Sequence, residues 1–442
     1  MRIAVVGSGI SGLVAAYVLS RTHEVTLFER DDRLGGHTHT HRVRRPDGEW
    51  TVDTGFIVCN DRTYPNFLAL LDLLGVPTQE SDMSFSVRCE ATGLEYNGTS
   101  LNTIFAQRRN LLRPSFHRML RDILRFHDDA RALLAEGPEL TFDEWLARGT
   151  SGGKPWSREF REHYLFPMCA AIWSSGVAEV GAFPARNFAR FFDNHGMLSV
   201  DDRPRWRTVA GGSDRYVARI VAPFRDRIRL ATPVDGIRRG PDHVELLPRG
   251  GTAERFDHVV VAAHSDQALR MLQDPSEAER DVLGAIPYRA NDAALHLDQS
   301  VMPRARLAQA SWNFHLLRDE GRAPVVTYDM NRLQRIPSRE RLFVTLNRTA
   351  DLAPERVLAR ATYEHPLYTR GATAAQARWA EVNGVRRTWF CGAYWGWGFH
   401  EDGVRSALRV TRAFGEDLGG ACSADAPAPR VPICAAHRES AR

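Results

Sequence analysis

A glycine-rich turn near the start of the chain constrains the fold more than any other feature. Residues 3–6 form a short apolar run typical of a strand buried on both faces, and the sequence GSGISG follows before a helical pattern that continues to residue 19. The glycines therefore fall in a strand-to-helix turn that predicts a dinucleotide site. Gly7 permits the tight turn, Gly9 lets backbone amides approach a pyrophosphate, and Gly12 lets the helix pack on the strand.

An acidic residue follows at the spacing that such a site requires. A second predicted strand, residues 24–28, ends at Glu29, where a carboxylate can accept hydrogen bonds from the adenosine ribose and disfavours a 2′-phosphate. The helix N-terminus faces the phosphates. The alternative, a glycine-rich turn without a ligand, leaves the register of strand, glycines, helix and acid unexplained. A second glycine pair in DRLGGHTHT, Gly35 and Gly36, allows another close backbone approach and favours FAD over NAD.

Composition places the chain among ordinary globular proteins. Its 442 residues are 43 % hydrophobic and 25 % charged, which leaves room for two or three packed subdomains. A net charge of +4 gives no reason to expect nucleic acid. The six cysteines have no metal-ligand spacing, so we expect no metal site, and they fit reduced thiols in a cytoplasm. We expect no membrane-spanning segment, because no apolar run reaches about 18 residues.

Several motifs resemble a known family. The series GSGISG, ER, RLGGH and VDTGF resembles the amino-terminal half of the flavin amine oxidase superfamily, which also includes protoporphyrinogen oxidases and carotenoid desaturases. The sequence FCGAYWGWGFHEDGVRSAL resembles its closing flavin motif. Together with VDTGFIVCN and AAIWSSGVAEVGAFPARNFARFF, it is similar to a bacterial branch of FAD proteins and to the flavin domain fused to plant cyclopropane fatty acid synthases.

The resemblance covers most of residues 1–415 and implies a set of cofactor contacts. FAD is expected to bind noncovalently, because no His or Cys stands where the superfamily forms its cysteinyl linkage, and Cys391 is expected in the core. The implied cofactor-binding residues, together with the fingerprint residues above, are Ile10, Ser11, Arg30, His37, Thr38, Thr54, Gly55, Phe56, Ile57, Val234, Ala262, Gly392, Glu401, Asp402 and Val404.

The predicted fold is α/β, with a Rossmann-like FAD-binding domain of the amine oxidase type interleaved with an α+β substrate domain. We assign residues 1–80, 205–285 and 385–418 to the discontinuous FAD-binding domain and residues 81–204 and 286–384 to the substrate domain with a helical cap. Residues 419–442, rich in Ala and Pro, are expected to form a flexible tail.

The cap is expected to contain a basic amphipathic helix. Phe116, Met119, Leu120, Ile123 and Leu124 recur at helical spacing, and arginines lie off that face. Two interpretations remain open: the solvated outer face of a packed helix, or contact with a membrane surface or an anionic substrate.

The closing motif is expected to support the flavin. A strand over residues 388–391 ends at Gly392, and a helix is predicted from Gly403 onward, so its N-terminus can face the flavin edge that becomes negative on reduction. Glu401 and Asp402 have a simpler role available, namely capping that helix.

The catalytic residues are unknown from sequence. The candidates are Tyr394, Trp397, His400, His195 and Trp173, each of which has ordinary core packing as its alternative. His37, His39 and His41 alternate and are predicted to share one face of a strand. Many amine oxidases have a lysine that holds a water near the flavin. The matching segment here, IPYRANDAALHLD, contains none, which weakens amine oxidation as the specific reaction.

The leading functional hypothesis is an FAD-dependent oxidase, dehydrogenase or desaturase that removes hydride from a small hydrophobic substrate, such as an acyl lipid or an intermediate of secondary metabolism. The electron acceptor is open, with O2 as one candidate, and a peripheral membrane contact is one of the open partners. A flavin-dependent isomerase and a non-catalytic flavoprotein partner of a lipid methyltransferase are the alternatives.

Overall fold

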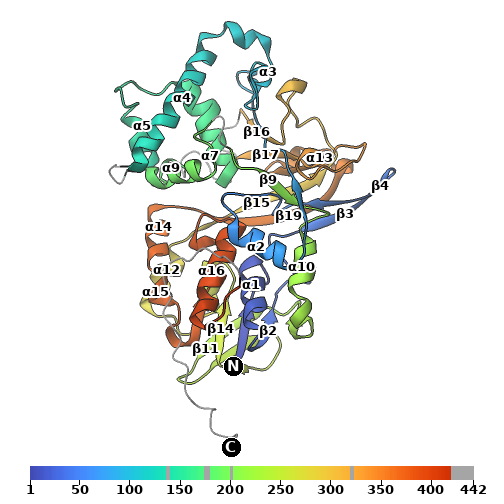
Figure 1. Ribbon diagram of the computed structural model, residues 1–442, viewed down its shortest axis with the longest axis vertical. Helices are drawn as coiled ribbons and strands as arrows, with labels where there is room; N and C mark the ends of the chain where they lie inside the picture. Colours follow the sequence, from blue (N-terminus) through green and yellow to red (C-terminus); the bar gives the residue numbers. More distant parts are fainter. Residues whose placement is uncertain (136–139, 174–179, 200–202, 319–322, 420–442) are drawn as a thin grey trace, which may run out of the picture.

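The computed structural model describes residues 1–135, 140–173, 180–199, 203–318 and 323–419, so the predicted tail lies outside the described residues except for Gly419. Two bodies lie along the long axis (Figure 1). One holds the amino terminus and the predicted FAD-binding segments, and the other holds the second sheet and the helical cap. Within the described residues, no helix is both long enough and apolar enough to cross a membrane.

A five-stranded parallel sheet forms the centre of the first body. Its order is β10-β2-β1-β14-β20, and Val5 of β1 lies between Leu27 of β2 and Val260 of β14. The sheet therefore unites three distant stretches of sequence, as the discontinuous domain assignment requires. The strands are β1 (Arg2–Val6), β2 (Glu24–Phe28), β10 (Ile228–Arg229), β14 (His258–Val261) and β20 (Thr388–Phe390).

Apolar clusters cover both faces of this sheet, because its strands are apolar on both sides. Ile3 and Val5 pack on one face with α1, α2, α10 and α16, whereas Ala4 and Val6 pack on the other with α11, α12 and the sheet β11-β12-β13. The bounds are α1 (Ile10–Leu19), α2 (Pro65–Leu73), α10 (Asp214–Ile220), η3 (Ala222–Arg227), α11 (Ser265–Met271), α12 (Glu277–Gly284), α16 (His400–Ala413), β11 (Val234–Arg239), β12 (Val244–Pro248) and β13 (Glu254–Phe256).

A seven-stranded mixed sheet is the floor of the second body. Its order is β19-β15-β18-β17-β16-β7-β8, with only β16 and β7 parallel. The edge strand β19 and its long partner β15 form the side of the sheet nearest the first body (Figure 1). The bounds are β7 (Phe85–Cys89), β8 (Glu95–Asn97), β15 (Tyr288–His296), η4 (Arg306–Ala308), β16 (Trp312–Leu316), β17 (Val325–Asp329), α13 (Met330–Leu333), β18 (Phe343–Leu346), η5 (Thr349–Asp351), η6 (Pro354–Arg356) and β19 (Val357–Pro366).

The helical cap packs around its own aromatic core. Phe126 contacts Trp145, Phe160 and Phe188 edge-on or tilted, with ring centroids 5.6–6.2 Å apart. Such contacts explain why a stretch with few long apolar runs still folds. The elements are α3 (Leu101–Ile104), η1 (Arg108–Leu112), α4 (Pro114–Ala135), α5 (Phe142–Ala147), α6 (Arg158–Phe160), η2 (Arg161–Leu165), α7 (Phe166–Trp173) and α9 (Ala185–Asn194).

Smaller elements join the two bodies. A two-stranded sheet, β3-β4, and a three-stranded sheet, β5-β9-β6, lie between them. Helices α14 and α15 were assigned to the substrate domain, yet their Ala375 and Val382 belong to the core of the first body. The bounds are β3 (Thr40–Arg45), β4 (Gly48–Asp53), β5 (Cys59–Asn60), β6 (Thr78–Glu80), β9 (Trp206–Val209), α14 (Arg370–Ala377), α15 (Trp379–Val382), η7 (Val385–Arg387) and η8 (Ala393–Trp395).

Three sequence-based expectations are wrong in detail. The closing helix begins at His400 rather than at Gly403, because Asp402 caps its first turn from within. Leu124, expected on the apolar face of α4, is 59 % exposed, since α4 packs through Phe116 and Met119 and turns Leu124 outward. His37, in a turn, and His39 both precede β3, so of the three histidines only His41 lies in the strand, although the rings of His39 and His41 are 4.1 Å apart.

Two glycines allow α1 to pack closely on its neighbours. A Cβ built on Gly12 would lie 1.9 Å from the carbonyl oxygen of Gly7, and one on Gly403 would lie 2.6 Å from Cγ2 of Ile10. The first clash lies where α1 meets the glycine turn, and the second lies where α1 meets α16. The junction therefore tolerates no side chain at either position.

We predict that Gly12→Ala destabilises the apoprotein. The added methyl group must displace backbone, and overpacking of this kind costs about 1–3 kcal/mol or more. Gly371→Ala is the matched control, because its Cβ would meet only the Thr369 hydroxyl, at 3.7 Å. In helix α14 that change should be stabilising by about 0.5–1 kcal/mol. Thermal unfolding measures both, and equal melting temperatures for the two variants would contradict the prediction.

Candidate active site

One continuous cavity of about 1370 Å³ connects the glycine turns with the second sheet and the cap. Its volume exceeds the 300–1,000 Å³ typical of a single small-ligand pocket, so it has room for a cofactor and a substrate together. Most of the predicted cofactor-binding residues line it: Gly7, Gly9, Ile10, Ser11, Glu29, Arg30, Gly35, Gly36, His37, Thr54, Gly55, Phe56, Ile57, Val234, Ala262 and Gly392.

Glu29 organises the end of the cavity beside β1 and β2. Its carboxylate accepts hydrogen bonds from the Ser8 amide at 2.8 Å, the Ser8 hydroxyl at 2.6 Å and the Asp31 amide at 3.0 Å. The Ser8 carbonyl in turn accepts from the Gly35 amide at 3.1 Å. The acid therefore fixes the relative position of the two glycine turns, and its remaining acceptor capacity faces the cavity.

Gly9 is required by a ligand rather than by the protein. A Cβ placed there meets no protein atom within 4 Å, and its backbone dihedrals (φ −63°, ψ 174°) suit any residue. The open space beside Gly9 belongs to the same cavity. These features fit a pyrophosphate that approaches the backbone at the N-terminus of α1.

Five predicted cofactor-binding residues do not line the cavity: Gly12, Thr38, Glu401, Asp402 and Val404. Glu401 instead accepts from the Asn66 amide at 3.2 Å and the Phe67 amide at 2.9 Å, so it caps α2. Asp402 accepts from the amides of Trp397 and Phe399. Burial raises the pKa of both carboxyl groups. The structure therefore gives these two acids a capping role, and their contact with the flavin stays a prediction.

His400, a catalytic candidate, lies at the first position of α16 on the cavity wall. Its ring stacks on Phe56 with centroids 3.6 Å apart, and its Nε2 lies 3.0 Å from the Thr38 hydroxyl. Burial, followed by the nearby His37, lowers the pKa of His400 well below its ordinary value. The imidazole is therefore neutral at physiological pH and is held by packing on both sides.

His195 is a second neutral imidazole in the same cavity. Its Nδ1 lies 2.9 Å from the Phe191 carbonyl, which assigns the proton to Nδ1 and leaves Nε2 as an acceptor. The ring stacks on Phe191 with centroids 3.9 Å apart. Burial lowers the pKa of His195 to about 4. The arrangement provides a positioned proton acceptor at neutral pH.

A wall of aromatic side chains surrounds these histidines. Trp173, Tyr394 and Trp397, singled out from the sequence, all line the cavity. Sequence analysis missed the residues that join them from the loop before β7 and from the seven-stranded sheet. These are Met83, Phe85, Tyr96, Trp312, Tyr328 and Tyr363.

A histidine cluster lies where the glycine turn meets β19. His37 is 5.3 Å from Tyr363, 5.5 Å from His365 and 6.2 Å from His264 between ring centroids. Burial lowers the pKa of His37 to about 4. Its Nε2 is buried without a hydrogen-bond partner in the described residues, so a bound ligand is the available partner. In those residues, no group of three or more His, Cys, Asp or Glu side chains is arranged so that it could hold a metal ion.

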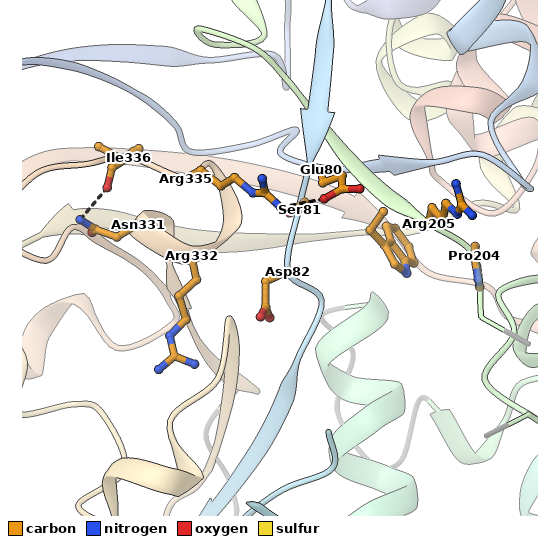
Figure 2. A pocket seen from close by; sticks show the side chains of 10 residues that line it. Glu80, Ser81, Asp82, Pro204, Arg205, Asn331, Arg332, Arg335 and Ile336 are labelled. Atoms are coloured by element: carbon orange, nitrogen blue, oxygen red, sulfur yellow. Dashed lines mark hydrogen bonds and ion pairs between the residues drawn. The ribbon is translucent and has the colours of Figure 1, made fainter. Parts of the chain in front are cut away.

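A second cavity, of about 750 Å³, adjoins the first through Asp82, Pro204 and Trp206 (Figure 2). Arg332 and Arg335 face it, but Arg332 pairs with Asp329 at 3.2 Å and Arg335 pairs with Glu80 at 2.9 Å. Its charges are therefore largely neutralised within the protein. This cavity is better described as a side opening than as an anion site.

We predict that Gly9→Val abolishes FAD binding without destabilising the apoprotein. The Cβ meets no protein atom within 4 Å, and the added side chain would occupy the space that the pyrophosphate needs. Gly152→Val is the control, because its Cβ has only the Thr150 hydroxyl nearby, at 3.8 Å, far from the cavity. Flavin absorbance per protein and apoprotein melting temperature measure the two effects. Stoichiometric FAD in Gly9→Val would refute the assignment.

Comparison with known proteins agrees with this geometry. The model of the family described as "Flavin containing amine oxidoreductase" matches residues 10–413. The L-amino acid dehydrogenase of Synechocystis sp. is 25 % identical over 274 residues, which span 59 % of this chain and 55 % of that protein. The match thus extends over about half the length of that relative.

Solved structures share the fold. Cyclohexylamine oxidase from Brevibacterium oxydans superposes with a TM-score of 0.67 at 17 % identity, covering 93 % of this chain and 98 % of its own. The CLA-producing fatty acid isomerase from P. acnes superposes with a TM-score of 0.64 at 16 % identity, covering 93 % and 98 %. With the family match across nearly the whole chain, these findings lead to one conclusion: the chain belongs to the flavin-containing amine oxidoreductases, and FAD is its cofactor.

Proposed function

We propose that this FAD-dependent oxidoreductase removes hydride from an elongated apolar substrate, such as an acyl lipid or a similarly apolar biosynthetic intermediate. The observation that carries the proposal is the aromatic wall of the large cavity, continuous with the flavin-binding residues. Each methylene buried against such a wall contributes roughly 0.8 kcal/mol. A long apolar molecule can therefore bind with few polar contacts.

The charged groups of the cavity support an apolar substrate over a cationic amine. We compare only the part of the cavity that lies away from the glycine turns and from residues 232–235, 249 and 262–271. In that part, the formally charged lining residues of the described chain are Asp82, Arg203 and Glu364. Asp82 accepts from the Ser84 amide at 2.8 Å and from the Ser311 hydroxyl at 2.7 Å. Both donors bind Oδ1, so an ammonium group would share the carboxylate with them and reach it through Oδ2.

The other carboxylate is engaged as well. Glu364 lies 3.3 Å from His264 Nδ1 and 3.3 Å from Gln267 Nε2. Both acids thus have hydrogen-bond partners inside the protein. Recognition of an amine would require an unengaged carboxylate or an aromatic cage dedicated to a cation.

The reaction divides between the cofactor and the neutral histidines. When bound, FAD supplies a two-electron acceptor for a hydride. His195 donates Nδ1–H to the Phe191 carbonyl, so Nε2 is the acceptor atom. Its neighbour is the Thr63 hydroxyl, at the long distance of 3.4 Å, which the substrate would displace for Nε2 to take a proton from the carbon next to the hydride donor. Loss of hydride from one carbon and of a proton from its neighbour leaves a carbon–carbon double bond. Exclusion of water by Phe191 and Phe399 keeps this base unprotonated.

An isomerase is the second candidate function. One structural neighbour is described as a CLA-producing fatty acid isomerase, which is a precedent for a fatty acid as ligand of this fold. In an isomerase the hydride returns to another carbon of the same molecule. The redox state of the product separates the two reactions.

We predict that acyl lipids, and not small amines, bleach the flavin. The oxidised enzyme is mixed anaerobically with saturated, unsaturated and methyl-branched acyl lipids and, separately, with primary and secondary amines, including L-amino acids. Visible absorbance reports reduction, and admission of O2 tests it as the electron acceptor. Rapid bleaching by amines alone would overturn the substrate proposal. A rearranged lipid with no lasting bleaching would identify the isomerase.

We predict that His195→Asn slows flavin reduction by about 10²–10⁴-fold, the usual contribution of a general base. FAD content should stay stoichiometric. Burial lowers the pKa of His195 to about 4, so the imidazole is already neutral above about pH 4. The wild-type rate should therefore show no inflection near pH 6.5, the ordinary pKa of histidine. His243→Asn, on the β11-β12 hairpin, is the control. An unchanged rate in His195→Asn would exclude this histidine as the base.

A further inference from the structure

Helix α3 lies near the end of the cap farthest from the amino terminus (Figure 1), and large apolar side chains in it and after it are exposed. Leu101 is 80 % exposed, Leu111 is 49 % exposed and Leu112 is 88 % exposed. Arginines lie among them in the sequence. We call this surface the cap tip and define it as Leu101, Arg108, Arg109, Leu111, Leu112 and Arg113.

Positive charge concentrates around these leucines. Residues 101–113 contain three arginines and no acidic residue, a formal charge of +3, whereas the entire chain carries +4. Arg108 donates to the Phe105 carbonyl and the Asn102 side chain, and Arg109 donates to the Gly93 carbonyl. These acceptors are neutral, so both guanidinium charges remain uncompensated by them.

The cap tip adjoins the wall of the large cavity. Tyr96, Gly98 and Thr99 line that cavity, and α3 begins two residues after Thr99 at Leu101. None of the residues of α3 is buried. The exposed leucines thus lie next to the cap side of the site rather than on a remote surface.

We propose that the cap tip docks on the surface of an anionic lipid bilayer. Exposed leucines flanked by arginines match the interface of such a membrane, where apolar side chains enter the boundary of the acyl region and arginines meet lipid phosphates. A soluble partner protein or a second copy of the chain would also bury leucines. The formal charge of +3 on residues 101–113 favours an anionic surface over a second copy of this weakly charged protein.

Docking at the cap tip orients the molecule. The adjoining cavity wall at Gly98 and Thr99 then faces the bilayer, and the sheet that binds the nucleotide end of the cofactor lies away from it (Figure 1). The exposure and the charge of the cap tip do not depend on which substrate occupies the cavity. Docking is therefore expected with any ligand of the cavity.

The test uses the FAD-loaded full chain and sedimentation with vesicles. Wild type should pellet with vesicles of phosphatidylcholine mixed with phosphatidylglycerol, bind phosphatidylcholine alone far more weakly, and be released by salt, since ionic screening weakens surface attraction. Leu111→Ser/Leu112→Ser should reduce the partition coefficient at least tenfold. A triple Arg→Gln change at positions 108, 109 and 113 should remove the preference for anionic lipid.

Leu73→Ser/Val385→Ser is the matched control, because these side chains are 50 % and 39 % exposed on the other body. It should bind vesicles as wild type does. Wild type that stays in the supernatant with anionic vesicles would overturn the proposal, as would undiminished binding by the cap-tip leucine variant. A concentration-dependent dimer in sedimentation velocity that the leucine variant abolishes would also overturn it. Vesicle binding requires no turnover, so its outcome is independent of the substrate test.

Discussion

The contact between α1 and its neighbours is the constraint on which the active site depends. Because Gly12 and Gly403 lack side chains, α1 lies directly against the glycine turn on one side and α16 on the other. The N-termini of the two helices thereby reach the same cavity, although their residues are almost 400 positions apart. We propose that the N-terminus of α1 would stabilise the pyrophosphate of FAD and that the N-terminus of α16 would face the ring, which becomes negative on reduction.

The burial of three histidine side chains determines which groups of the cavity can accept a proton. The imidazoles of His37, His195 and His400 are all held neutral by desolvation. Meanwhile Glu401 and Asp402, the acids of the closing motif, are consumed by helix capping. Away from the glycine turns and from residues 232–235, 249 and 262–271, the cavity thus combines neutral imidazoles with three formally charged lining residues of the described chain, Asp82, Arg203 and Glu364. Such a site suits the breaking of carbon–hydrogen bonds more than the binding of ions.

Local features were predictable from the sequence and nonlocal ones were not. The glycines, Glu29 and the flanking strands lie within one βαβ unit, so spacing alone placed them correctly. The aromatic wall combines Phe85 and Trp312 with cap residues, and no sequence periodicity joins such distant segments. The exposure of Leu124 was missed because helical spacing identifies an apolar face but not which of its positions the neighbouring helices reach.

The order of the parallel sheet has a consequence for biosynthesis. Strand β1 cannot pair with β14 until His258 has been made, and the sheet is incomplete until β20 at Thr388 follows. At about 5–20 residues per second, the interval from β1 to β20 lasts roughly 20 to 80 seconds. Throughout it the ribosome carries apolar strands with unpaired edges, which are prone to aggregate. The yield of this enzyme in a cell therefore depends on how long a partial sheet is protected, and not only on how stable the finished sheet is.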